Sequence, residues 1–234
     1  MKEILDDARI DQYLTQYALD DVFPSSLRQH LALYRFEPGD TLCKQGEIPE
    51  YIFFLMLGKV KVYTTSADGK TLLINFTSPL GVLGEIECLN ELENLNTVSA
   101  VTKVETIVFH KRWLKLYREE VPFLQFMLHL VTEKFYNKSV SLSFNLLYPV
   151  EVRLASYLLS VTTPEDAIVS TTHLKDMANL IGTSYRHLNR IILGFTGMNL
   201  IERSRGTLLV KDRKGLEETA GKNIYENGDR KEQK

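Results

Sequence analysis

Short apolar runs separated by glycines fill residues 36–110. The runs are rich in valine, isoleucine, phenylalanine, tyrosine and threonine, and the glycines interrupt them at fairly regular spacing. Such residues favour strands, whereas glycine clusters mark turns. The dipeptide Asp68-Gly69 lies between the runs KVKVYTT and KTLLINF and predicts a tight hairpin. We therefore expect a rolled antiparallel sheet of the jelly-roll type, a fold that by itself hosts many functions.

A helical period follows in residues 111–148, where we predict one long helix. Pro122 suits a first helical turn, and apolar residues recur at steps of four, three, four and then seven. This stripe consists of Leu124, Leu128, Val131, Phe135 and Leu142. Two interpretations stay open, because such a stripe packs either on its own sheet or on a second copy of the chain. The pair Tyr148-Pro149 should end the helix and form a hinge, since a residue before proline disfavours the helical region.

The segment LKDMANLIGTSYRHLNRII, residues 174–192, has the pattern of a helix-turn-helix. Ala178 is small where two helices approach each other, and Gly182 suits a turn that needs a positive φ. Ile181, Leu188 and Ile191 supply apolar contacts between the helices. The outer face is rich in hydrogen-bond donors, and it consists of Ser184, Tyr185, Arg186, His187, Asn189 and Arg190. Such a face fits the DNA major groove, although a helix pair in an ordinary bundle shows the same apolar spacing.

A basic region follows the second helix. The segment ERSRGTLLVKDRKG alternates polar and apolar residues around Gly206 and predicts a two-stranded wing. Residues 174–214 hold eight basic and three acidic residues, whereas the first 148 residues hold fifteen and nineteen. A basic module on a mildly acidic body concentrates the attraction for phosphate in one place. We expect double-stranded DNA as the partner, with Arg203, Arg205 and Lys211 on its phosphates.

Composition excludes several other classes. The chain has 234 residues and is 44% hydrophobic, enough for two globular domains. Cys43 and Cys88 are too few for a disulfide framework, a zinc finger or a four-cysteine iron–sulfur site, so we expect buried thiols, with a redox pair as the lesser alternative. The five histidines are isolated: His30, His110, His129, His173 and His187. The sequence shows no convergent set of nucleophile, base or metal ligands. We therefore expect neither an enzyme nor a metal site.

The N-terminus, MKEILDDARIDQYL, lacks the apolar core and the cleavage site of a signal peptide. No apolar run approaches membrane-spanning length. We therefore expect a cytoplasmic protein with no membrane partner.

The string TLCKQGEIPEYIFFLMLGKVKVY resembles the signature of cyclic-nucleotide-binding β-rolls, with matching glycines at Gly46 and Gly58. Pro49 departs from the small residue that many members have. Leu83-Gly84-Glu85-Ile86 matches the start of the ligand-binding cassette of that family. Together with the long helix and the helix-turn-helix, this layout resembles the Crp/Fnr family of bacterial transcription regulators over about residues 15–215. The phrases GEIE, SYRHL and KDRKGL are similar to its YeiL-like branch.

The resemblance implies an α+β architecture and a homodimer that binds a pseudo-palindromic DNA site. It also implies RNA polymerase as a further partner. The expected domains are an N-terminal helix and β-roll sensor (1–110), a dimerisation helix (111–148), a winged helix-turn-helix (149–216) and a flexible tail (217–234). The alternative is a cyclic-nucleotide-binding-like signalling module with no role in gene regulation, which would have no use for the helix-turn-helix and its basic wing.

The family also implies an effector pocket at Gly84, Glu85, Ile86, Asn96 and Thr97. In its cyclic AMP sensors the cassette glutamate accepts hydrogen bonds from the ribose, and an arginine some ten residues later pairs with the phosphate. Glu85 matches the glutamate, but residues 85–102 contain neither arginine nor lysine. A buried phosphate without a partner is costly, which argues against cyclic AMP bound in the usual way. We predict no cofactor, and a cationic or hydroxyl-rich effector and a vestigial pocket both stay open.

Within the reading helix, family base contacts fall on Tyr185, Arg186 and Arg190. Arg186 stands where the family often has glutamate. Glutamate accepts from cytosine, whereas arginine donates two hydrogen bonds to guanine. We therefore expect a half-site that differs from the usual family consensus.

Overall fold

The computed structural model describes residues 1–23, 25–117, 119–171, 174–221, 223 and 225, without the side chains of residues 115 and 137–146. The chain divides into two compact units, one of Met1–Val62 with Thr77–Tyr136 and one of Tyr63–Phe76 with Asn137–Lys234. The division falls inside the long helix, ahead of the predicted boundary at Tyr148-Pro149. Among the described residues, no helix combines the length and the hydropathy that a membrane crossing requires.

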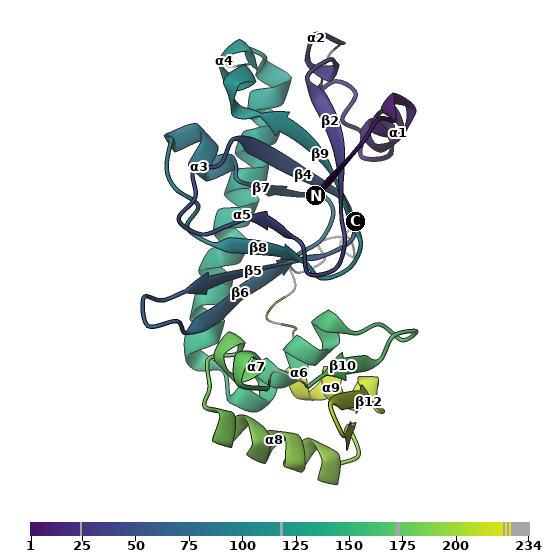
Figure 1. Cartoon of the computed structure of the whole chain (residues 1–234), viewed down its shortest axis with the longest axis vertical. Coiled ribbons are helices and arrows are strands. Elements are labelled where there is room, and N and C mark those ends of the chain that lie inside the picture. Colours follow the sequence, from purple (N-terminus) through teal and green to yellow (C-terminus); the bar gives the residue numbers. More distant parts are fainter. Residues whose placement is uncertain (24, 118, 172–173, 222, 224, 226–234) are drawn as a thin grey trace. The chain divides into compact units, whose positions relative to one another are not determined.

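Two sheets form the predicted roll (Figure 1). One has the strand order β1-β2-β9-β4-β7 and the other has the order β3-β8-β5-β6. The bounds are β1 Lys2–Ile4, β2 Leu31–Phe36, β3 Thr41–Cys43, β4 Tyr51–Leu57, β5 Val60–Thr65, β6 Thr71–Thr77, β7 Gly81–Leu83, β8 Thr97–Ala100 and β9 Val104–His110. The α+β architecture and the hairpin at Asp68-Gly69 are thus confirmed, and the outer part of that hairpin, Tyr63–Phe76, belongs to the second unit.

The apolar run in the middle of the roll is the central strand pair of the larger sheet. β4 and β9 pair antiparallel with Phe53 opposite Val108. β4 is buried from Ile52 to Met56, on both faces. A strand that is covered on both sides has a continuous apolar sequence instead of an alternating one. Burial of this strand fixes the core on which the helices of the first unit pack.

Gly58 shows why the family signature requires glycine between β4 and β5. Its φ is +87°, a conformation that residues with a side chain rarely adopt. A Cβ atom at this position would lie 2.1 Å from the backbone oxygen of Lys103. The glycine therefore permits a close approach of two backbone segments.

The predicted long helix is shorter than expected at its start. Residues 111–117 form a 3₁₀ turn, Lys111–Trp113, and a short helix α4, Leu114–Tyr117, and the long helix α5 is Val121–Leu147. The single helix over 111–148 is thus wrong before Val121, because Leu114 and Tyr117 turn inward and are buried in the core. Pro122 lies in the first turn of α5, as expected.

The described part of α5 has two apolar faces. Phe123, Met127 and Leu130 are buried against the roll, together with residues such as Phe54 and Phe109. The predicted stripe lies on another face, where Leu124 is 43% exposed, Leu128 68% and Phe135 73%, and Val131 is half-buried. The side chain of Leu142 lies outside the described ones. Most of the described stripe therefore does not pack on the sheet of its own chain.

An ion cluster joins the N-terminal helix α1, Asp7–Gln16, to the larger sheet. Glu105 in β9 is 1% exposed and accepts hydrogen bonds from Arg9 Nε at 2.7 Å, from Tyr13 Oη at 2.8 Å and from Arg35 Nη2 at 2.9 Å. A second short helix, α2 (Ser25–Arg28), precedes β2. Burial by itself would raise the pKa of Glu105, but the hydrogen bonds from Tyr13 and Arg35 and the two arginine charges together lower it.

We expect Glu105→Gln to destabilise the first unit by roughly 2 kcal/mol, because it removes the negative charge that Arg9 and Arg35 share. The loss stays moderate, since both arginines keep some contact with solvent. The lowered folded pKa means that the carboxylate stabilises the fold above its unfolded pKa, about 4.3, and that this stabilisation is lost as the pH falls through the folded pKa. Chemical unfolding at pH 7 and pH 3 tests this. The difference between wild type and variant should shrink at pH 3, and an equal difference at both values would contradict the assignment.

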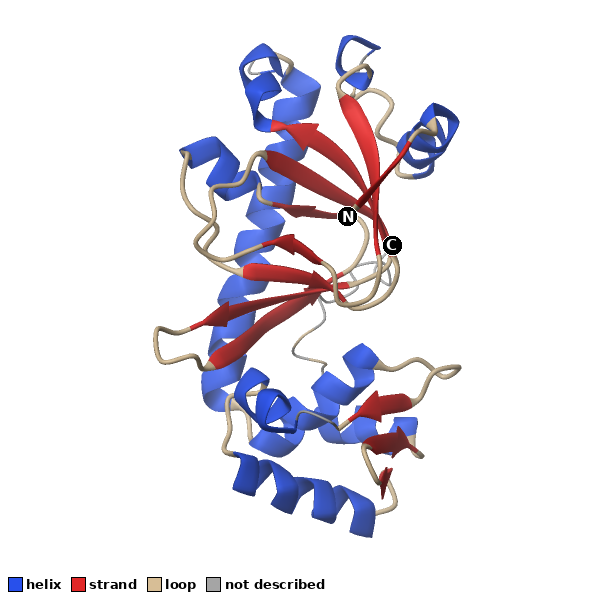
Figure 2. Cartoon of the chain, in the orientation of Figure 1, coloured by secondary structure: helices blue, strands red, loops and turns tan. Residues whose placement is uncertain are grey.

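The second unit contains helices α6 to α9 and a small sheet (Figure 2). The bounds are α6 Val150–Val161, β10 Ile168–Ser170, α7 Leu174–Leu180, α8 Tyr185–Gly197, β11 Ile201–Ser204, β12 Thr207–Val210 and α9 Arg213–Ala220. The predicted wing is confirmed in β11 and β12, but β10 adds a third strand beside β12. The predicted two-stranded wing is therefore part of a three-stranded sheet, and the third strand was not predicted. The helix break at Tyr148-Pro149 is present, with Pro149 as the N-cap of α6.

The chain stays ordered beyond the predicted start of the tail at residue 217. Helix α9 continues to Ala220, where Leu216 and Ala220 are buried in the core of the unit. Tyr225 is 1% exposed, and burial raises the pKa of its hydroxyl. A flexible tail from 217 is thus wrong for residues 217–220 and for Tyr225, whereas residues 222, 224 and 226–234 lie outside the described ones.

Candidate DNA-reading surface and effector pocket

The turn between α7 and α8 is built as the sequence predicted. Gly182 has a φ of +66°, and its N–H donates to Asn179 O while the N–H of Thr183 donates to Ala178 O. This pair of bonds is the Schellman ending of a helix, which needs a left-handed residue such as glycine. Ala178 is 1% exposed, in the core that also holds Leu188.

Arg153 in α6 fastens this turn. Its Nη1 donates to Ile181 O at 2.8 Å and to Gly182 O at 3.3 Å. These carbonyls follow the last residue of α7 and lie where a helix end leaves acceptors without a partner, so a donor from another helix satisfies them. A side chain from outside the motif therefore holds the turn between α7 and α8.

We expect Gly182→Ala and Gly194→Ala to act in opposite directions. At Gly182 a Cβ would lie 2.9 Å from Arg153 Nη1 on a backbone of positive φ, so alanine should cost about 1–2 kcal/mol. Gly194 lies in the exposed part of α8 with open space around its Cβ position, so alanine should add about 0.5–1 kcal/mol. Denaturant unfolding followed by circular dichroism measures both, and destabilisation by Gly194→Ala would contradict this account.

The outer face of α8 presents part of the predicted reading set. Tyr185, Arg186 and Arg190 are exposed, as the predicted role in base contact requires. Ser184 is exposed too, but its Oγ caps the helix by accepting from the N–H of His187 at 3.2 Å. His187 is half-buried, and its Nε2 has no partner among the described residues. The open reading surface is therefore narrower than the predicted face.

A side-chain hydrogen bond joins the wing to α8, beside their shared apolar core. Arg203 Nη1 in β11 donates to Asn189 Oδ1 at 3.0 Å, and Asn189 Nδ2 donates to Tyr185 O at 3.2 Å. Lys211 Nζ lies 3.4 Å from Glu202 Oε2. Arg205 lies exposed at the turn before Gly206. Of the three predicted phosphate contacts, Arg205 is the one for which the structure gives no competing protein partner among the described residues.

The residues of the predicted effector pocket lie where β7 leads into α3, Glu85–Asn90, and at the start of β8. Gly84 has a φ of +77° and Glu85 is fully buried, whereas Ile86, Asn96 and Thr97 are half-buried. Thr97 Oγ1 accepts from the backbone N–H of Gln45 at 3.2 Å. The carboxylate of Glu85 is thus the buried charged group of this set.

A lysine from the long helix holds that carboxylate. Lys134 Nζ in α5 lies 2.6 Å from Glu85 Oε1 and donates a second hydrogen bond to Val82 O at 3.1 Å. The side chain of Lys134 is 27% exposed. The other oxygen, Glu85 Oε2, is buried and has no partner among the described residues. The cassette carboxylate is therefore already paired with a cation of its own chain.

Both cysteines are buried, as predicted. Burial raises the pKa of Cys43 to about 12 and that of Cys88 to about 12. The thiolate is the reactive form, so both groups are poor nucleophiles at neutral pH. This chemistry weighs against the redox pair. Of the isolated histidines, His173 lies outside the described residues.

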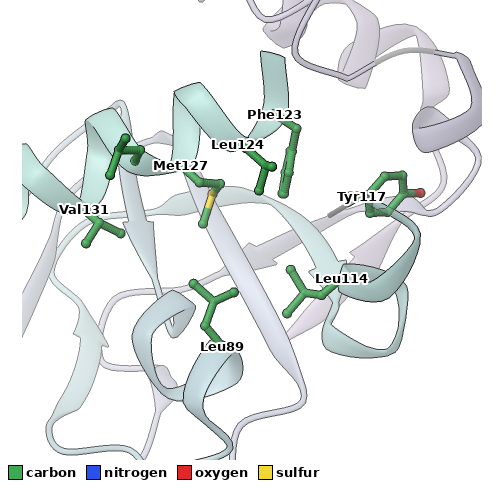
Figure 3. A pocket seen from close by; sticks show the side chains of 8 residues that line it. Leu89, Leu114, Tyr117, Phe123, Leu124, Met127 and Val131 are labelled. Atoms are coloured by element: carbon green, nitrogen blue, oxygen red, sulfur yellow. The ribbon is translucent and has the colours of Figure 1, made fainter. Parts of the chain in front are cut away.

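An apolar cavity of about 270 Å³ opens beside the exposed stripe of α5. Its lining comes from α3, α4 and α5, and it consists of Leu89, Leu114, Tyr117, Phe123, Leu124, Met127, Leu128 and Val131. In Figure 3 Met127 and Leu89 extend toward each other from opposite walls. The stripe thus borders a cavity whose apolar lining suits apolar side chains.

Sequence reasoning missed two residues that shape these sites, Lys134 and Arg153. A signal existed for Lys134, because it continues the inward stripe of Phe123, Met127 and Leu130 at a step of four. A lysine at an inward position requires a buried partner for its charge. For Arg153 the sequence offered only a basic residue within an apolar helix.

Two family models match the chain in the order of its domains. The cyclic nucleotide-binding domain matches residues 33–118, and the Crp-like helix-turn-helix domain matches residues 152–219. The regulatory protein YeiL of Escherichia coli O157:H7 is 28% identical over 87% of this chain and 92% of its own length. A CRP-like cAMP-activated global transcriptional regulator of Mycobacterium tuberculosis is 22% identical over 92% of this chain and 98% of its own.

Solved structures share the fold. A protein of Eubacterium rectale described as a Crp/Fnr-family transcriptional regulator superposes with a TM-score of 0.74 at 16% identity, over 90% of this chain and 99% of its own. A CRP-family regulator of Thermus thermophilus gives 0.64 at 16% identity, over 82% and 98%. With both domain models in sequence and the helix-turn-helix in place, the chain belongs to the Crp/Fnr family of transcription regulators.

Proposed function

We propose that this chain is a sequence-specific DNA-binding regulator that acts as a homodimer and whose β-roll does not take cyclic AMP in the usual way. The observation that carries the proposal is the exposed donor face of α8, with Tyr185, Arg186 and Arg190 on a helix whose preceding turn is held by Arg153. A helix in the major groove reads bases with such side chains.

The exposed stripe of α5 supports the homodimer. Leu128 and Phe135 are more than two-thirds exposed, and Leu124 and Val131 line the adjacent cavity. An apolar stripe at heptad-like spacing is stable in water when a second helix covers it. The occupant that we propose is α5 of a second copy. A two-fold dimer then requires a pseudo-palindromic site with half-sites about 34 Å apart, one turn of DNA.

The effector part of the proposal rests on charge. Glu85 is already paired with Lys134, and residues 85–102 provide no cation for a phosphate. A cyclic nucleotide would therefore find no unpaired carboxylate for its ribose and no cation for its phosphate. A signal felt by the roll would act by shifting the population of DNA-competent dimers, with the helix break at Tyr148-Pro149 as the hinge. RNA polymerase is the partner through which such a regulator acts on transcription.

Selection from random genomic fragments at several salt concentrations tests this function. We expect enriched fragments that share a two-fold sequence, bound without added cyclic AMP, over a background of non-specific binding that falls steeply with salt. A signalling module without a role in gene regulation would bind no fragment. Binding with no shared sequence would leave only a non-specific DNA-binding protein and would overturn the proposal.

A further inference from the structure

We infer that the effector site of this β-roll is built for an ammonium group and that the chain supplies this group itself from Lys134. The inference deepens the proposed function, because it rests on the β-roll being the effector domain. It makes Lys134 the residue that determines what the site accepts.

The first step is the cost of the buried carboxylate. Glu85 is 0% exposed, so its charge cannot be solvated by bulk water. A buried charge is tolerated when it is paired and hydrogen-bonded. Lys134 Nζ, at 2.6 Å from Oε1, provides both the charge and the hydrogen bond. The ammonium group is thus the partner around which this carboxylate is placed.

The second step is how Lys134 is held. It lies on the face of α5 that carries Met127 and Leu130 into the core, so its aliphatic stem extends along that face while part of the side chain keeps contact with solvent. Val82 O takes a second proton of the ammonium group at 3.1 Å. Two acceptors on β7 and α3 therefore recognise one cation, and this joins α5 to the cassette.

The third step is competition. A ribose hydroxyl is a neutral donor, and hydrogen bonds from a charged donor to a carboxylate are roughly twice as strong. Lys134 is moreover tethered, so it competes at an effective concentration of about millimolar or above. The other oxygen, Glu85 Oε2, has no hydrogen-bond partner among the described residues, and it is buried beside the pair. Lys134 therefore excludes a nucleotide from Glu85. In a variant that lacks this lysine, the site accepts an amine.

Chemical rescue of Lys134→Ala tests this assignment in the full-length protein. The substitution deletes the equivalent of n-propylammonium and leaves Glu85 buried without a counter-charge. We expect the melting temperature to fall by roughly 5 °C, and n-propylammonium to restore part of this loss while n-propanol does not. Lys103→Ala, which removes an exposed lysine of the same unit, is the matched control and should show neither effect.

The second arm uses Glu85→Gln and the double variant. Because Glu85 is fully buried and Lys134 reaches solvent, Glu85→Gln should lower the melting temperature less than Lys134→Ala, and Glu85→Gln/Lys134→Ala should recover part of the loss without responding to n-propylammonium. Equal effects of the amine on all variants, or an unchanged Lys134→Ala, would overturn the inference. So would calorimetric binding of cyclic AMP to wild type that Glu85→Gln abolishes.

These measurements need no DNA. A failed rescue would overturn the ammonium site and leave the selection from genomic fragments untouched. A failed selection would overturn the regulator and leave the rescue standing.

Discussion

Replacing Leu128 by glutamate should convert the protein from a dimer to a monomer and weaken binding to a two-half-site DNA by about a hundredfold or more. Leu128 is 68% exposed in the single chain and lies between Leu124 and Phe135 on the same stripe. In a two-fold seam each residue lies close to its own symmetry mate, so the substitution places two carboxylates in an apolar interface. Desolvation and like-charge repulsion both oppose that interface.

Sedimentation equilibrium of wild type and Leu128→Glu over a range of concentrations measures the dimer directly. Ile48→Glu is the matched control, because Ile48 is 62% exposed in the roll but is not part of α5. The control should remain dimeric, and far-ultraviolet circular dichroism should show that all three proteins are folded. If Leu128→Glu sediments as a dimer and still binds both half-sites, the stripe of α5 is not the seam.

Local signals in the sequence predicted most of the fold. Gly182, Ala178 and the apolar residues of the helix-turn-helix act within a few positions of one another, so spacing alone determines the turn. The β-roll was readable because its strands are bounded by glycines such as Gly58, whose backbone conformation requires that residue. Strand β10 was missed because three residues between loops carry no period that distinguishes them from a linker.

The parts of the sites that escaped prediction depend on side chains that are distant in sequence. Glu85 and Lys134 are 49 positions apart, and Arg153 reaches Ile181 over 28. A periodic pattern indicates that a helix exists but does not state what lies opposite each position. Residues 85–102 contain no cation, and the cation that pairs with Glu85 lies on α5.

The structure also changes how we expect the predicted DNA contacts to divide between base reading and phosphate binding. Arg203 was grouped with the phosphate contacts, but its bond to Asn189 connects the wing with the reading helix. Asn189 already uses its amide oxygen and one of its two amide hydrogens within the protein, so fewer of its hydrogen-bonding groups are free than the sequence predicted. Arg205 is left as the wing arginine that suits a test of phosphate binding, and Arg186 as the residue that suits a test of base reading.

Replacing Arg186 by glutamate should change which half-site the protein prefers. Arg186 is exposed in the first turn of α8, the part of a reading helix that contacts base edges. An arginine donates two hydrogen bonds to the O6 and N7 atoms of guanine, whereas a glutamate accepts from the N4 amino group of cytosine. The preferred base at one half-site position should move from guanine to cytosine, at a cost of about 1–3 kcal/mol for the original site.

Arg205→Ala is the control for loss of charge. Arg205 is exposed at the wing turn, so its removal should weaken all sequences alike and lower the salt dependence by about 0.9 in the log–log slope for each phosphate that the protein no longer neutralises. The effect of Arg203→Ala on the ranking of bases should lie between the effects of Arg186→Glu and Arg205→Ala, because this substitution removes a charge and also removes the hydrogen bond to Asn189. Selection from a randomised half-site measures the ranking of bases, and fluorescence anisotropy at several salt concentrations measures the affinity for DNA. Together the two measurements separate a change in base preference from a general loss of affinity. A uniform loss in all three variants, with the ranking of bases unchanged, would mean that Arg186 does not read a base and that α8 presents another residue to the groove.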